Sequence, residues 1–220
     1  KKALELNPRN VDAAMVIAFL ENHKNPIDVL AAYDKVIETE KQYLKRDDYF
    51  KLDSGDFWLV FETRPYMRAL RERMDYLSNL DRTTDAIKQA EEILELNKND
   101  NQGVRYQLMP LYAQMENLKA CLSLLKKYKE ESVGFMLPIA ICCYRLGKYK
   151  ECDEYLMKAY QHNKHLFKVL LDPKTFVDTD ISYYSPGEES EMVMVLEECF
   201  GLMTFTPSFS DYLEKFKDVN

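Results

Sequence analysis

Most of the chain repeats one motif, a pair of helices joined by a very short turn. Apolar residues recur with the 3.6-residue period of an α-helix, for example at Ile87, Ala90 and Leu94. The period predicts helices over residues 11–22, 26–46, 64–80, 83–96, 99–115, 118–128, 134–146 and 149–161. Short connections place successive helices antiparallel. We therefore expect an all-α protein built from helix pairs.

Small residues in the second helix of three successive pairs set the interval of the repeat. Ala86, Ala120 and Cys152 are separated by 34 and 32 residues. Small side chains at these positions let paired helices approach closely, where a leucine would clash. A period near 34 residues is that of the tetratricopeptide repeat.

Several segments resemble that repeat family. Residues 2–8 (KALELNP) resemble the end of a repeat, 85–97 its second helix, and 146–159 the turn and second helix of another. Lys98 and Ser132 stand where the family carries a terminal proline. The resemblance implies a right-handed α–α superhelix whose first helices line a concave, peptide-binding groove.

Longer strings carry a second resemblance. Residues 62–69, 96–106 and 183–188 are similar to segments of bacterial tetratricopeptide proteins of poorly defined function. The tail is distantly similar to the eukaryotic family called suppressor of tumorigenicity seven. These similarities imply a repeat protein with a special C-terminal cap, and they imply no known reaction.

The repeats are expected over residues 1–166, and a divergent cap over 167–220. The first repeat reads as truncated, which suggests a fragment of a longer protein, and the best-defined repeats are 67–100, 101–132 and 133–166. The cap combines a polar loop over 175–187 with helices over 188–203 and 208–217. A solenoid needs such a cap to cover its last apolar surface.

Two segments before the central repeats are also distinctive. Residues 47–55 form a polar connection. The following stretch carries Phe57, Trp58, Val60 and Phe61, an aromatic cluster that we expect in the core.

Charge and cysteine content narrow the functional classes. A net charge of −7 argues against nucleic-acid binding and against docking on an anionic membrane. No apolar run approaches the roughly 20 residues of a membrane helix. Five cysteines, without a Cys-x-x-Cys pair, suit reduced and buried thiols in a cytoplasmic protein.

Mapping the repeat onto the chain predicts a binding groove. Its expected lining is Arg68, Arg71, Asp75, Gln102, Arg105, Met109, Tyr112, Leu137, Ile141 and Tyr144. Arginine offers paired donors to carboxylates, and tyrosine offers apolar area with a polar tip. These side chains would suit a partner segment with acidic groups. The alternative is that the arginines pair with neighbouring acids on a solvated face.

A second set of residues lies before successive first helices. It consists of Arg64, Tyr66, Asn101 and Tyr106. One hypothesis is that Arg64, Arg68 and Arg105 converge on a ligand. The other is that this set makes hydrogen bonds between repeats and fixes their pitch. Pro65 is expected to start one helix, and Asn99 or Asp100 to cap the next.

No pattern points to catalysis, a cofactor or a metal. His162 and His165 share a helix end, but no third ligand is evident. Cys142 and Cys143 lie in an apolar helix. The carboxylate pairs at 47–48 and 178–180 lie in loops without a partner that would shift a pKa.

The sequence therefore predicts a protein–protein interaction module. It would bind a peptide or partner segment, with Arg68, Arg71 and Arg105 supplying charge and Tyr112 and Tyr144 apolar contact. One alternative is a peptide-sensing regulatory domain of a larger protein. Another is a scaffold that assembles with copies of itself.

Overall fold

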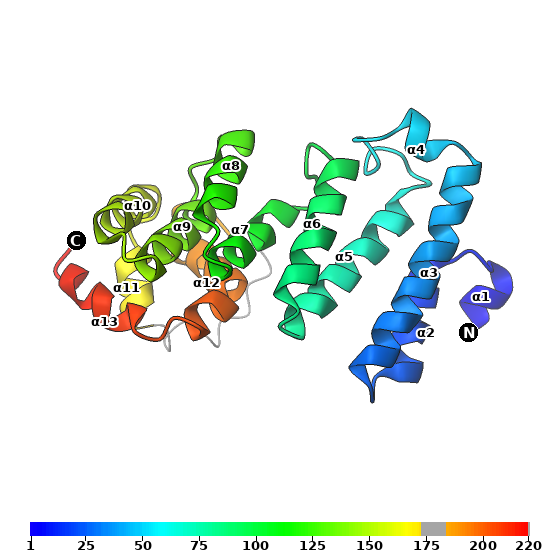
Figure 1. The fold of residues 1–220 in the computed structure, drawn as a ribbon, viewed down its shortest axis with the longest axis horizontal. Helices are drawn as coiled ribbons and strands as arrows, with labels where there is room; N and C mark the ends of the chain where they lie inside the picture. The colour runs from blue at the N-terminus through cyan, green and yellow to red at the C-terminus, as the bar shows by residue number, and fades with distance from the viewer. Residues whose placement is uncertain (173–183, 220) are drawn as a thin grey trace. The chain divides into compact units, whose positions relative to one another are not determined.

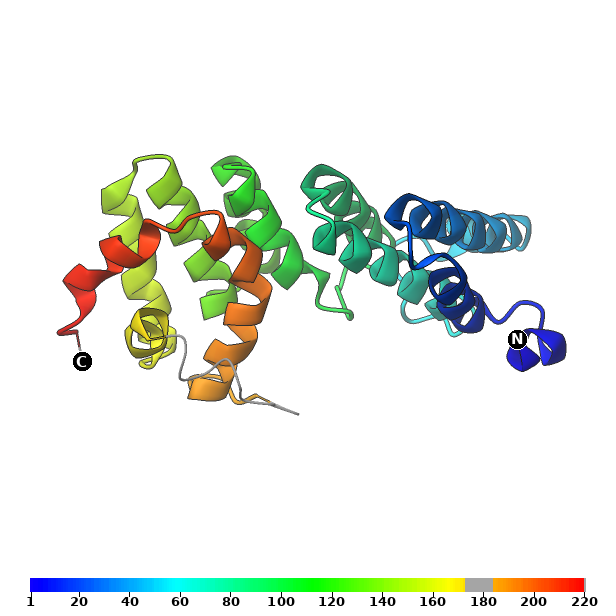
Figure 2. The same ribbon diagram turned by 90° about the horizontal axis from the view of Figure 1, so that it is seen from below.

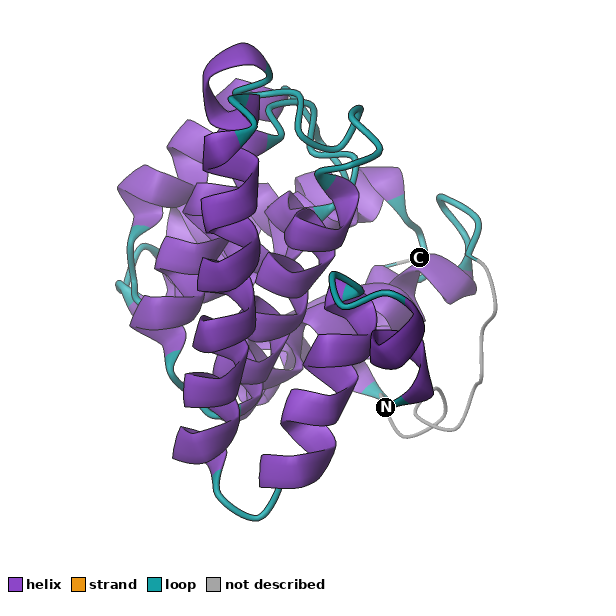
Figure 3. Ribbon diagram, turned by 90° about the vertical axis from the view of Figure 1, so that its right-hand side faces the viewer, coloured by secondary structure: helices purple, strands orange, loops and turns teal. Residues whose placement is uncertain are grey.

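The protein is all-α, as the periodicity predicts. A computed structural model describes residues 1–172 and 184–219, and over these ranges it contains α-helices and no β-strand (Figures 1 and 3). The chain divides into two compact units, residues 1–104 and 105–220. The predicted polar loop over 175–187 lies mostly outside the described residues.

The first unit contains two helix pairs. Its helices are α1 (Lys2–Leu6), α2 (Val11–Asn22), α3 (Pro26–Arg46), α4 (Tyr49–Leu52), α5 (Arg64–Asn79) and α6 (Thr83–Leu96). α2 packs against α3, and α5 against α6. The predicted helix starts follow from local chemistry: Asn10 and Asn25 cap α2 and α3, and Pro26 and Pro65 occupy first turns.

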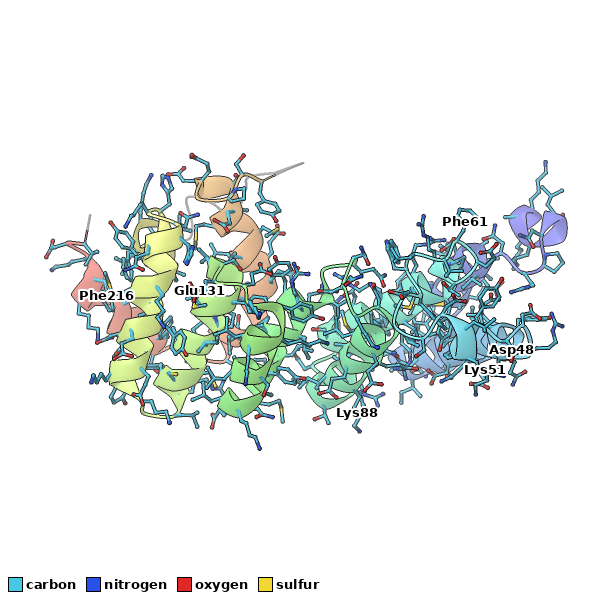
Figure 4. All side chains as sticks on the ribbon, turned by 90° about the horizontal axis from the view of Figure 1, so that it is seen from above. Asp48, Lys51, Phe61, Lys88, Glu131 and Phe216 are labelled. Carbon is cyan, nitrogen blue, oxygen red and sulfur yellow. The ribbon has the colours of Figure 1, made fainter. Side chains whose placement is uncertain are left out.

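The connection between α3 and α5 departs from the prediction. It contains the short helix α4 within the segment expected to be only polar loop. It then folds onto the end of α6, where the Phe57 amide donates to the Leu96 carbonyl (2.9 Å). Phe57 is buried as predicted. Phe61 is 77% exposed, so its assignment to the core is wrong (Figure 4).

The second unit is centred on α9. Its helices are α7 (Val104–Gln114), whose first residue belongs to the first unit, α8 (Leu118–Tyr128), α9 (Val133–Arg145), α10 (Tyr149–His162), α11 (Leu166–Leu171), α12 (Glu189–Thr204) and α13 (Phe209–Leu213), followed by the 3-10 helix η2 (Glu214–Phe216). α9 contacts α8, α10 and α12. The expected cap helices therefore belong to the same compact unit as the helix pairs they follow.

Helix α7 begins later than predicted. Asp100 and Gly103 adopt left-handed backbone conformations (φ 49° and 69°) that interrupt the helical path. The Val104 amide donates to Asp100 Oδ1 at 2.7 Å, so Asp100 provides the predicted cap four residues before the helix.

The three central helix pairs share one turn geometry. Asp81, Glu116 and Gly147 each have positive φ, two residues after the last residue of the first helix. The next amide donates back to a carbonyl five residues earlier, from Arg82 to Leu77, Asn117 to Tyr112 and Lys148 to Cys143, at 2.9–3.0 Å. This is the Schellman arrangement, which satisfies free carbonyls at a helix end. The same short turn thus recurs in all three pairs.

Of the three residues at this left-handed position, only Gly147 is of a type that adopts positive φ without strain. Replacing Gly147 with alanine is expected to lower the stability of the second unit by about 1 kcal/mol, because a Cβ is strained at φ +70° even in open space. Gly201→Ala, inside α12 where a Cβ meets no clash, should leave stability equal or higher. Urea unfolding monitored by circular dichroism tests both. An unchanged Gly147→Ala protein would contradict the strain argument.

Burial changes the assignment of one of the three small residues that set the predicted interval. Ala86 and Cys152 are fully buried at the fourth residue of α6 and α10. The fourth residue of α8 is Cys121, which is fully buried, whereas Ala120 is half-buried. Cys121 is therefore the equivalent packing residue. All five cysteines are free and buried, as predicted.

A candidate protein-binding face

Helices α2 and α5 lie side by side in the first unit. Arg68 makes a two-point ion pair with Asp12, with Nε–Oδ1 at 2.8 Å and Nη2–Oδ2 at 2.6 Å. Two turns further on, Phe19 packs edge-to-face on Tyr76 with 6.2 Å between ring centroids. The two first helices therefore run parallel. We call their outward surface the α2/α5 face, made by Asp12, Val16, Phe19 and Leu20 of α2 with Arg68, Arg71 and Asp75 of α5.

The α2 side of this face is apolar and bare. Met15 and Ala18 bury one side of α2 in the core, yet Val16 is 53% and Leu20 60% exposed on the opposite side. Phe19 is also exposed. A helix that is apolar all round is normally buried all round. The sequence analysis missed these residues, and the apolar character of 11–22 on every side was the available signal.

The α5 side of the face is charged but internally paired. Arg71 lies 3.2 Å from Asp75 and donates to the Gln102 carbonyl at 2.7 Å. Gln102 in turn donates to the Met67 carbonyl at 3.3 Å. Arg71 and Gln102 therefore join α5 to the turn before α7.

The exposed ion pair contributes little to folding. Replacing Arg68 with alanine is expected to change the free energy of unfolding by less than about 1 kcal/mol, because both partners are solvated. Thermal unfolding of the variant beside wild type measures this. A loss of several kcal/mol would mean that Arg68 is a structural residue and not an available surface group.

A cavity of about 350 Å³ lies on the other flank of α2. Ala14, Ile17 and Val36 contribute to its apolar wall, and Glu40 and Arg9 to its polar wall. Arg9 donates to the buried Glu40 carboxylate at 2.8 Å. That hydrogen bond raises the pKa of Arg9.

In the second unit the predicted groove is covered by the chain itself. Met109, Leu137 and Ile141 are fully buried. Helix α12 packs along α9 (Figure 2), and Gly201 of α12 lies next to the Gln114 side chain of α7.

Tyr144 is held by the same C-terminal segment. Its hydroxyl donates to the Ser208 carbonyl at 3.1 Å, and its ring packs on Phe209 and Tyr212. The surface that Tyr144 was expected to offer to a partner is thus occupied by α13.

Arg105 belongs to a closed cluster. It lies 2.9 Å from Glu130 and over the rings of Tyr106 and Tyr128. Burial tends to raise the pKa of Glu130, but hydrogen bonds from Tyr106 and Arg105 outweigh it and lower that pKa. Burial and the bond to Glu130 raise the pKa of Tyr106. The cluster joins α7 to the α8–α9 connection. Tyr112 is half-buried in α7.

The predicted set before the first helices is mainly structural. Arg64 donates to the Trp58 carbonyl at 2.8 Å, and Tyr66 is fully buried. Asn101 is exposed. Arg64 and Arg68 have different hydrogen-bond partners, and Arg105 belongs to the other unit.

The described residues contain no group of three metal-ligating side chains. His165 instead lies 3.3 Å from Glu189. Among the helices that the structure describes, none combines the length and apolar character needed to cross a membrane.

No protein-family profile matches the chain, and no curated protein is significantly similar to it.

Proposed function

We propose that the protein is a protein–protein interaction module of tetratricopeptide type, with its helix pairs forming a right-handed superhelix, and that the α2/α5 face binds a segment of a partner. The observation that carries the proposal is the bare apolar side of α2, with Val16 and Leu20 beside the exposed Arg68. Neighbouring apolar side chains left exposed mark surfaces that contact other proteins. Phenylalanine and arginine, here Phe19 and Arg68, are residue types enriched at such interfaces.

The choice of the first unit follows from where side chains are available. In the second unit Tyr144 contacts α13 and Arg105 is paired with Glu130. On the α2/α5 face, Val16 and Leu20 are exposed, and Arg68 shares its charge only with an exposed carboxylate. A carboxylate on a partner could replace Asp12 at little cost.

Site-specific crosslinking tests this proposal. A photoreactive amino acid at Val16 should capture a partner from cells that contain the protein, and the same group at Leu122, an exposed residue of α8, should not. Adding Leu20→Glu should abolish the Val16 product while circular dichroism stays unchanged. Equal capture at both positions, or capture insensitive to Leu20→Glu, would refute the proposed face.

The two alternatives predict different products. A regulatory, peptide-sensing domain would use the same face and yield a short peptide at position 16. A self-assembling scaffold would yield a crosslink between two copies, together with a dimer mass in light scattering.

A further inference from the structure

We infer that the α2/α5 face receives an amphipathic α-helix, of the same chemistry as the α12 helix of this chain. This inference rests on the proposed function and specifies the partner's chemistry. The observations behind it come from the second unit, where another helix packs on α9, the helix equivalent to α2.

Helix α9 is the precedent. Its thirteen residues carry no charge before Arg145, and every residue from Phe135 to Cys143 is buried. Helices α8 and α10 pack on two sides of α9, and α12 covers a further one. In the second unit, therefore, the first helix of a pair is apolar on all sides and is buried by a further helix that packs along it.

The covering helix has a clear chemical pattern. Met192, Val195, Cys199 and Leu202 are buried at spacings of three and four residues, the stripe of an amphipathic helix. Its first turn is acidic, with Glu189 and Glu191.

The direction of α12 is set at its two ends. The start of the helix is held by Asn163, which follows α10, and Arg145 at the end of α9 donates to Thr206 just beyond α12. α12 therefore runs in the same direction as α9.

Helix α2 is the uncovered counterpart of α9. Both are the first helix of a pair, and α2 carries only Asp12 and Glu21 as charged residues. Val16 and Leu20 are four residues apart, so they form a ridge suited to the groove of another helix. The neighbouring α5 side adds Arg68, which matches the acidic residues of an α12-like helix.

Backbone chemistry favours a helix over an extended peptide. The α2/α5 face consists of two helices whose backbone groups are already paired, so it has no free edge that could bond to a strand. An extended segment buried there would leave its own amides unpaired. A helix satisfies them internally and offers only side chains to the surface.

A synthetic peptide probe tests the inference on the full chain. The probe is residues 188–205 of this protein with blocked termini and a fluorescent label. Binding is measured by anisotropy up to millimolar protein, and helix formation by circular dichroism. We expect saturable binding with a gain in helicity, and a loss of affinity of at least about tenfold in Val16→Glu/Leu20→Glu protein. Leu122→Glu protein is the matched control and should bind normally.

A second peptide separates the inference from the proposed function. It carries Glu197→Pro, which breaks the helix but keeps the apolar residues. Equal binding of this peptide at Val16 and Leu20 would overturn the helical occupant and leave the proposed face standing. Binding unaffected by Val16→Glu/Leu20→Glu would mean that the probe exchanges with α12 on α9, and would overturn the inference. If the wild-type protein is a dimer and the Val16→Glu/Leu20→Glu protein is a monomer, the occupant is a second copy of the chain and the inference is overturned. Binding of neither peptide would also overturn the inference.

Discussion

Replacing Leu202 with alanine is expected to destabilise the second unit by about 2–5 kcal/mol and to loosen the packing of α12 on α9. Leu202 is 1% exposed and lies on the side of α12 that faces the unit's core. The truncation leaves a cavity that the packed neighbours fill only in part. Hydrogen exchange should increase in α9. The fluorescence of Trp58, the single tryptophan, reports the first unit and should not change.

Phe200 provides the control for this prediction. It lies on the same helix but is 72% exposed, so Phe200→Ala should change stability by less than about 0.5 kcal/mol. If both variants lose the same free energy of unfolding, the buried residues of α12 are not what holds α12 against α9. Unchanged exchange in α9 after Leu202→Ala would contradict the cover in the same way.

Replacing Asn163 with leucine is expected to cost about 3 kcal/mol. Its side chain is fully buried and joins three elements: it donates to the Glu188 carbonyl at 2.8 Å and to Glu191 at 2.9 Å, and accepts from the His165 amide at 2.9 Å. Leucine fills the space but removes all three hydrogen bonds, and the buried Glu191 carboxylate keeps the one from the Gly187 amide (2.8 Å).

Gln161, two residues earlier and exposed, is the matched position for that test. Gln161→Leu should leave urea unfolding within about 0.5 kcal/mol of wild type. A mild effect of Asn163→Leu would indicate that water reaches the carboxylate of Glu191 and replaces the lost donor.

The helices themselves were predictable because their signals are local. The ranges 83–96 and 118–128 coincide with α6 and α8. The start of α7 was missed because Asp100 tolerates a left-handed conformation that apolar periodicity does not report. Helix α4 was missed because a single turn of helix has no measurable period.

The candidate site was harder to predict, since it depends on contacts distant in sequence. Periodicity places Leu137 and Ile141 on a helix, but it does not show that this helix also packs against α12, which follows much later in the chain. Arg71 seemed available until the turn before α7 supplied the Gln102 carbonyl. Val16 and Leu20 were not singled out, because apolar periodicity does not show whether another element covers a helix.

The packing of α12 on α9 also has a consequence for biosynthesis. Helices α7 to α10 contact near neighbours and can pair as soon as they leave the ribosome, whereas the partner that seals α9 is made only after α11 and the segment that follows it. Until then a helix with no charge over twelve residues has an open flank. Nascent chains halted in that interval should therefore be the form of this protein that chaperones retain most and that aggregates most readily.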